Sequence, residues 1–155
     1  MVQRMTSGPD ERAPGVRFVV SVYREFEQVA RRGDLSMAQY RTLLYLLGGS
    51  RRAGELASAN AVTKPTVSAM ITSLRQQGWV ADVVDETGDG RVTRVELTPE
   101  GRARLARFEQ ELADRMEELV PGVDRAEMRT FLRELASAHA ETREERLGTA
   151  FGTSP

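Results

Sequence analysis

The stretch VTKPTVSAMITSLRQQGW, residues 62–79, decides the fold that we predict for this chain. Thr63 is a residue type that caps helix N-termini, and Pro65 falls in the first helical turn, where its missing N–H costs little. Four apolar residues at spacings of three and four then share one helix face: Val67, Met70, Ile71 and Leu74. The sequence therefore predicts a helix that runs to about residue 77 and ends at Gly78.

The opposite face of this helix carries one cation and several short side chains. These residues are Lys64, Thr66, Ser68, Ala69 and Thr72. Short side chains let a helix enter a DNA groove, hydroxyls bind phosphates or bases, and an alanine contacts a thymine methyl group. The solvated face of an ordinary amphipathic helix has the same polarity, so the pattern alone leaves both interpretations open. Residues 49–81 carry four basic residues against Glu55 alone, a net charge of +3, which favours a nucleic-acid partner.

Three helices are predicted before this stretch. Residues 1–15 are rich in Gly and Pro and read as a flexible arm, and a first helix follows over residues 16–32. Its apolar face comprises Val16, Val19, Tyr23, Phe26 and Ala30. A second helix begins at Ser36, where Gln39 completes a capping box. Its apolar stripe comprises Tyr40, Leu43, Leu44 and Leu47, and a short third helix covers residues 53–59.

After Gly78 the hydrophobic period changes from near four to two. Residues 79–84 and 92–97 alternate as strands, and the two glycines of residues 85–91 mark a hairpin loop. Thr98 and Pro99 then begin a long helix that Pro121 and Gly122 end. A last helix starts at about Asp124, and residues 148–155 read as a fraying tail. The order predicts a mainly α protein with a small two- to three-stranded β wing, a winged helix-turn-helix.

The stretch from Ser36 to Leu105 resembles the multiple antibiotic resistance regulator (MarR) family of bacterial repressors. The residues that carry the likeness are Leu35 to Gln39, Glu55 to Ala57, Val62 to Ser68, Leu74, Gly78, Asp89 to Arg91 and Val95 to Gly101. Each motif alone is weak, but their order and spacing together are specific. The flanking helices match the family in position and apolar periodicity, though not by motif, so the resemblance covers almost the whole chain.

The resemblance implies a homodimer that binds double-stranded, pseudo-palindromic operator DNA, most often as a repressor. Residues 16–34 and 102–147 would then form the dimerisation helices, and residues 35–101 the DNA-binding domain. Lys64, Pro65, Thr66, Ser68, Ala69 and Thr72 would face the major groove. Arg91 would enter the minor groove with Asp89 orienting its guanidinium, which agrees with the attraction of narrow minor grooves for arginine. A salt bridge within the hairpin is the simpler interpretation of this pair.

The resemblance also implies a small aromatic or anionic effector bound between the dimerisation helices and the DNA-binding domain. The side chains that could line such a pocket are Tyr23, Phe26, Tyr40, Phe108 and Met116. At this helical spacing they would also serve as ordinary core residues. His139 lies on the predicted apolar stripe of the last helix, where a packed or interfacial histidine is the usual outcome and a pH switch the alternative.

Three positions depart from the family pattern. Ala69 and Ser73 stand where arginines are common, and Asp82 stands where a basic residue is common. Residues 82–100 hold six acids against two arginines, a net charge of −4, so we expect fewer phosphate contacts. Arg51 and Arg52 could compensate by contacting the DNA backbone, or could be solvated surface. The acidic segment also supports an alternative, a winged-helix module that binds a protein without binding DNA.

Composition excludes several other functions. The 155 residues contain no Cys and one His, which removes disulfides, thiol redox sensing and multi-histidine metal sites. No nucleophile elbow, phosphate loop or zinc-protease motif is present, so we expect no enzyme and no cofactor. Residues 85–96 have the oxygen spacing of a calcium loop, but both flanks alternate with period two instead of being helical, so we expect no metal. No apolar run has the length of a membrane span, and we expect a cytoplasmic protein.

Overall fold

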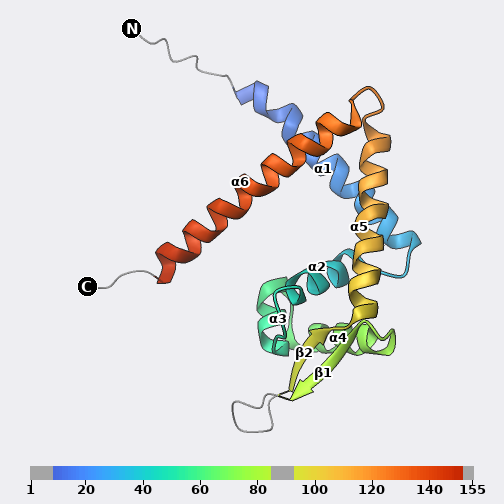
Figure 1. Cartoon of the computed structure of the whole chain (residues 1–155), viewed down its shortest axis with the longest axis vertical. Coiled ribbons are helices and arrows are strands. Elements are labelled where there is room, and N and C mark those ends of the chain that lie inside the picture. Colours follow the sequence, from blue (N-terminus) through green and yellow to red (C-terminus); the bar gives the residue numbers. More distant parts are fainter. Residues whose placement is uncertain (1–8, 85–92, 152–155) are drawn as a thin grey trace. The chain divides into compact units, whose positions relative to one another are not determined.

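The computed structural model describes the backbone of residues 9–84 and 93–151, and the side chains of residues 12–84 and 93–140. The described elements are helices and one two-stranded sheet (Figure 1). In chain order they are α1 (Pro9–Arg32), α2 (Met37–Leu46), α3 (Ala53–Asn60), α4 (Lys64–Gln76), β1 (Val80–Val84), β2 (Thr93–Leu97), α5 (Pro99–Leu119) and α6 (Arg125–Phe151). The chain divides into two units, residues 1–116 and 117–155, each described by itself. The predicted winged helix-turn-helix is confirmed.

The predicted helix caps are present in the structure. The Ser36 hydroxyl accepts a hydrogen bond from the Gln39 N–H at 3.2 Å, and the Gln39 side chain accepts one from the Ser36 N–H at 2.9 Å. Thr63 caps α4, where its hydroxyl accepts from the Thr66 N–H at 3.4 Å. Thr98 caps α5 by accepting from the Gly101 N–H at 3.0 Å. Each cap pairs a backbone N–H that has no partner inside its own helix.

The core of the first unit lies where α2, α3, α4, α5 and the sheet meet. Its most deeply buried side chains are Leu35, Thr42, Leu43, Leu46, Leu56, Val67, Leu74 and Phe108. One polar pair crosses this core. The Asn60 amide donates to the Thr42 hydroxyl at 3.1 Å and to the Leu56 carbonyl at 3.0 Å, and Thr42 donates to the Ala38 carbonyl at 3.0 Å. The pair therefore ties α3 to α2 without leaving a buried amide unpaired.

The wing is an antiparallel hairpin with a short third partner. β1 pairs with β2 so that Val80 faces Leu97 and Asp82 faces Val95. On the other edge of β2, the Arg51 N–H donates to the Val95 carbonyl at 2.9 Å, and the Val95 N–H donates to the Arg51 carbonyl at 2.7 Å. This backbone bridge is the third strand position of the predicted two- to three-stranded wing.

Helix α1 differs from the prediction in its start and in its buried face. It begins at Pro9, so part of the predicted arm over residues 1–15 is helical. Proline suits a first helical position, and Pro14 within the helix removes a single backbone hydrogen bond. The predicted face is buried only near the end of the helix, at Ala30, whereas Val16 and Val19 are 63% and 66% exposed. The reason is that the core of this chain covers only the C-terminal part of α1.

The second unit contains the end of α5 and the whole of α6. Asp124 caps α6, because its carboxylate accepts from the N–H groups of Ala126 and Glu127 at 2.9 and 3.0 Å. Glu117 is buried and accepts from the Arg129 guanidinium at 2.6 and 2.9 Å. The predicted stripe on α6 is half-buried or exposed: Met128 and Leu132 are half-buried, and Phe131, Leu135 and His139 are exposed. The helix continues to Phe151, so the predicted tail from residue 148 is partly helical.

Candidate nucleic-acid interface

Helix α4 separates a buried face from an exposed one, as predicted. Val67, Ile71 and Leu74 are buried and anchor the helix in the core. All six residues predicted to meet the major groove are exposed: Lys64, Pro65, Thr66, Ser68, Ala69 and Thr72. The first turn of α4 carries no acidic residue, so the positive end of the helix dipole and the Lys64 ammonium act together. The exposed face can therefore approach an anionic surface, and its contact with DNA stays a prediction.

Local hydrogen bonds fix how the hydroxyls of α4 are presented. The Thr66 hydroxyl lies 2.8 Å from the capping hydroxyl of Thr63. The Thr72 hydroxyl donates to the Ser68 carbonyl at 2.9 Å, which leaves its lone pairs as acceptors. The Ser68 hydroxyl has no hydrogen-bond partner among the residues whose side chains are described. Ser68 therefore offers the less constrained donor on this face.

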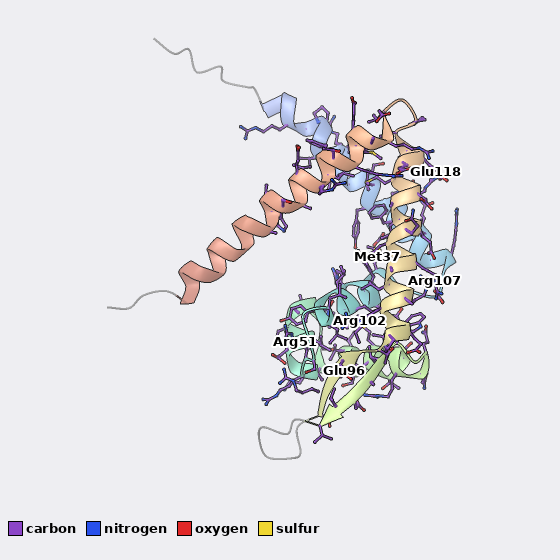
Figure 2. The ribbon with its side chains drawn as sticks, viewed as in Figure 1. Met37, Arg51, Glu96, Arg102, Arg107 and Glu118 are labelled. Carbon is purple, nitrogen blue, oxygen red and sulfur yellow. The ribbon has the colours of Figure 1, made fainter. Side chains whose placement is uncertain are left out.

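The two arginines before α3 are placed differently from one another. The Arg51 guanidinium donates to the Gly48 and Ser50 carbonyls at 3.3 and 3.4 Å and lies 5.3 Å from the centre of the Tyr45 ring (Figure 2). Arg52 is exposed at the start of α3, and its backbone N–H donates to the Glu55 carboxylate at 2.6 Å. A DNA contact from the Arg51 side chain would thus require it to leave its own turn.

Two further arginines near the wing were not singled out from the sequence. Arg94 of β2 donates to the hydroxyl and carbonyl of Ser50 at 3.1 and 2.9 Å, which holds the wing against the turn before α3. The Arg75 guanidinium at the end of α4 lies 2.7 Å from the Asp82 carboxylate on β1. The nearness of Arg75 and Asp82 in the chain was the available signal, since a helix that is followed by a hairpin brings its last turn beside the first strand.

An open hollow of about 230 Å³ lies between α4 and the wing. Its polar lining comes from Ser68, Thr72 and Arg75 on α4 and from Asp82 and Thr93 on the strands. Asp89 and Arg91, predicted for the minor groove, lie outside the described residues. The structure therefore brings two of the six predicted α4 residues, Ser68 and Thr72, next to the base of the wing.

A buried arginine connects α5 to the rest of the first unit. Arg104 is 5% exposed and donates to the Asp34 carboxylate at 2.6 and 2.8 Å and to Glu111 at 3.4 Å. Its guanidinium lies 5.9 Å from the ring centre of Trp79 and 5.4 Å from that of Phe108. The hydrogen bond from Arg104 holds the pKa of Asp34 below its ordinary value. This cluster was not predicted from the sequence, because Asp34, Trp79 and Arg104 are far apart in the chain.

None of the five predicted effector-binding residues lines either of the two hollows described among these residues, so their role stays a prediction. Tyr40 packs edge-to-face on the fully buried Phe108, with ring centres 5.2 Å apart. Burial, with a smaller contribution from Glu109, raises the pKa of Tyr40 to about 12. Of the other three, Phe26 and Met116 are half-buried and Tyr23 is exposed. A hollow of about 350 Å³ between α1 and α2 is lined by Glu27, Ala30, Arg31, Ser36, Met37 and Ala38 instead.

Other kinds of site find no support in the part of the chain that the structure describes. No group of three His, Asp or Glu side chains there could hold a metal ion. No helix among these residues is both long and apolar enough to cross a membrane.

The sequence and the fold are similar to those of MarR family proteins. Residues 33–92 match the model of the MarR family. A MarR family protein from Bacillus stearothermophilus has a similar structure, with a TM-score of 0.65 and 20% identity over 86% of this chain and 94% of its own. The transcriptional repressor CouR bound to a 23-mer DNA duplex aligns with a TM-score of 0.58 and 27% identity over 79% of this chain and 87% of its own. NadR in complex with 4-hydroxyphenylacetate aligns with a TM-score of 0.56 and 18% identity over 89% and 97%. The comparison with curated proteins found no match.

Proposed function

We propose that this chain, whose residues 33–92 match the model of the MarR family, is a homodimeric, ligand-responsive repressor of a pseudo-palindromic operator. The observation that carries the proposal is the division of α4 into a buried apolar face and an exposed face of Lys64, small side chains and hydroxyls. A helix of this kind enters the major groove with its N-terminal residues at the base edges. Operator binding also places the protein in the cytoplasm with the chromosome.

Each predicted DNA contact has a distinct part in this proposal. Thr66, Ser68, Ala69 and Thr72 read base edges or bind phosphates, with Pro65 shaping the first turn. Lys64 supplies a phosphate contact at the positive end of α4. Arg91 enters the minor groove with Asp89 beside it, and Arg52 contacts the backbone. Arg51 contributes mainly through the wing bridge, because its guanidinium is held by Gly48 and Ser50.

Dimerisation is supported by apolar side chains that one subunit leaves uncovered. Val16 and Val19 on α1 are more than 60% exposed, and Phe131 and Leu135 on α6 are 59% and 51% exposed. Soluble proteins rarely leave rows of large apolar side chains in water, so a second copy is the partner that fits both helices. Analytical ultracentrifugation at micromolar concentration tests this, and a monomer would contradict it.

Effector binding is supported by the solved complex of NadR with 4-hydroxyphenylacetate, a small aromatic anion. The residues proposed to bind such a ligand here are Tyr23, Phe26, Tyr40, Phe108 and Met116. Tyr40 and Phe108 already pack on one another. A ligand must therefore either bind to the other three residues or separate these two rings. A ligand that releases the operator must bind unequally to the two states of the dimer. Thermal-shift screening with aromatic carboxylates tests the proposal.

The decisive experiment is a fluorescence-anisotropy titration with DNA from upstream of the protein's own gene. We expect Lys64→Ala and Arg91→Ala to weaken binding while the dimer persists. Arg107→Ala is the matched control, since it removes one exposed arginine from α5 (Figure 2). Equal losses in Lys64→Ala and Arg107→Ala would mean that only total charge matters.

The second candidate function is a winged-helix module that binds a protein instead of DNA. The observation that favours it is the acidic balance of residues 82–100, six acids against two arginines. An acidic wing repels phosphates, whereas a basic protein surface would attract it. Absence of DNA binding at low salt would support this candidate over the repressor.

A further inference from the structure

We propose that Asp82 is a positioning residue, which holds the charge of Arg75 away from the DNA backbone and so weakens the sequence-independent part of DNA binding. This inference rests on the proposed operator binding and concerns an ion pair at the same surface. It starts from position 82, where the sequence departs from the MarR family pattern. An acidic residue stands there instead of a basic one, beside the helix proposed to face the major groove.

Arg75 belongs to the face of α4 that is proposed to meet DNA. Ser68, Thr72 and Arg75 are spaced by four and then three residues, so their side chains form one row along the helix. All three line the hollow between α4 and the wing. A guanidinium at the end of this row is well placed to reach a phosphate, since its planar fork matches phosphate oxygens.

Asp82 lies on the face of the sheet that closes this hollow. It pairs with Val95 in the hairpin register, and Val95 is buried in the core. From that position its carboxylate accepts a hydrogen bond from the Arg75 guanidinium at 2.7 Å. The pair therefore places one negative charge beside the only basic residue that α4 carries besides Lys64.

The ion pair of Arg75 with Asp82 contributes little to the stability of the fold. The two side chains remain 42% and 43% exposed, and ion pairs that are this accessible contribute little to stability because water screens them. The larger consequence is electrostatic, because a paired arginine presents almost no net charge to an approaching polyanion. Phosphate contacts carry no sequence information, so suppressing one weakens operator and non-operator binding together. The operator then depends more on the base contacts of the α4 row.

Asp82→Asn tests the proposal, with Glu96→Gln as its matched control. Both substitutions remove one exposed carboxylate from the wing, but Glu96 pairs with Ala81 and lies on the other face of the sheet (Figure 2). Dissociation constants are measured for operator and shuffled duplexes across a salt series, with thermal unfolding as the check on folding. Asp82→Ser is carried in parallel, so that a folding defect in one variant does not decide the result.

The expected result is tighter binding of both duplexes by Asp82→Asn, by a similar factor on each, because the released phosphate contact is independent of sequence. One added phosphate contact steepens the salt dependence by about 0.9 in log–log slope, so the gain shrinks roughly three- to fourfold between about 50 and about 200 mM salt. Glu96→Gln should change the slope less. In an Arg75→Ala background, Asp82→Asn should bring no gain.

Three outcomes would overturn the inference while leaving operator binding intact. They are an unchanged slope in Asp82→Asn, an equal effect of Glu96→Gln, and a gain that persists without Arg75. Failure of the wild-type dimer to bind any DNA at low salt would instead overturn the proposed function, and this inference with it.

Discussion

Arg104 and Asp34 lie 70 residues apart in the chain, yet the buried guanidinium donates two hydrogen bonds to one carboxylate oxygen, at 2.6 and 2.8 Å. The interaction joins α5 to the loop between α1 and α2, and the same guanidinium contacts the Trp79 ring at the start of the wing. The orientation of the winged domain on α5 thus depends on a charged cluster as well as on apolar packing.

The Asp34 carboxylate should make stability depend on pH in the acid range. Its pKa in the folded chain lies below the ordinary 3.8, so it stabilises the fold above that value and loses this contribution as the pH falls toward the folded pKa. We expect Asp34→Asn to have a lower Tm than wild type at pH 7, and the difference to vanish in strong acid. The effect is modest because Asp34 is 61% exposed. Asp114→Asn, an exposed carboxylate on α5, is the control, and a parallel loss there would contradict the assignment to Arg104.

Tyr40 should make stability depend on pH at the alkaline end. Its pKa is raised to about 12, so the neutral phenol stabilises the fold below the ordinary value of 10.0, and that contribution is lost as the pH rises from there toward 12. The Tyr40→Phe variant should lose less stability over this range than wild type. An ultraviolet phenolate titration should also lack the component near pH 12. Retention of that component in Tyr40→Phe would show that another group produces it.

Gly101 should tolerate no side chain. A Cβ atom at this position would overlap the Trp79 carbonyl and crowd the Leu97 side chain, because the first turn of α5 packs directly on the wing. We expect Gly101→Ala to lower the free energy of unfolding by about 1–3 kcal/mol or more. Gly54→Ala is the control, since nothing lies within 4 Å of a Cβ there and α3 should gain up to about 1 kcal/mol. Chemical denaturation measures both, and equal stability of the two variants would refute the packing argument.

At Thr42, loss of the hydroxyl should lower the free energy of unfolding more than loss of the methyl group. Thr42→Val keeps the shape but removes the acceptor of the buried Asn60 amide, which should cost about 1–3 kcal/mol. Thr42→Ser keeps the hydrogen bond and should cost less. The ranking is read from urea unfolding midpoints, and a more damaging Thr42→Ser would mean that apolar packing outweighs the hydrogen bond.

The sequence predicted those features that depend on neighbouring residues. The capping box of Ser36 and Gln39, the cap at Thr63 and the buried face of α4 all follow from spacings of three or four, which helix geometry fixes. The ion pair of Arg104 with Asp34 was missed because a single sequence does not show which distant charges meet. The pair of Arg75 with Asp82 was also missed, although the order of helix and hairpin was a signal for it. The buried face of α1 was assigned too far toward its start, since periodicity shows which residues share a face but not how much of it one subunit covers. The hairpin tip, with Asp89 and Arg91, lies outside the described residues and stays a prediction.

The bridge between Arg51 and Val95 is made by main-chain atoms alone, and this separates the architecture of the wing from the chemistry of position 51. Any residue with a backbone N–H can form both hydrogen bonds, so side chains there can be exchanged without loss of the third strand position. Proline is the exception, because it removes the donor. A saturation library at this position should therefore yield folded proteins in which the wing keeps its third strand position.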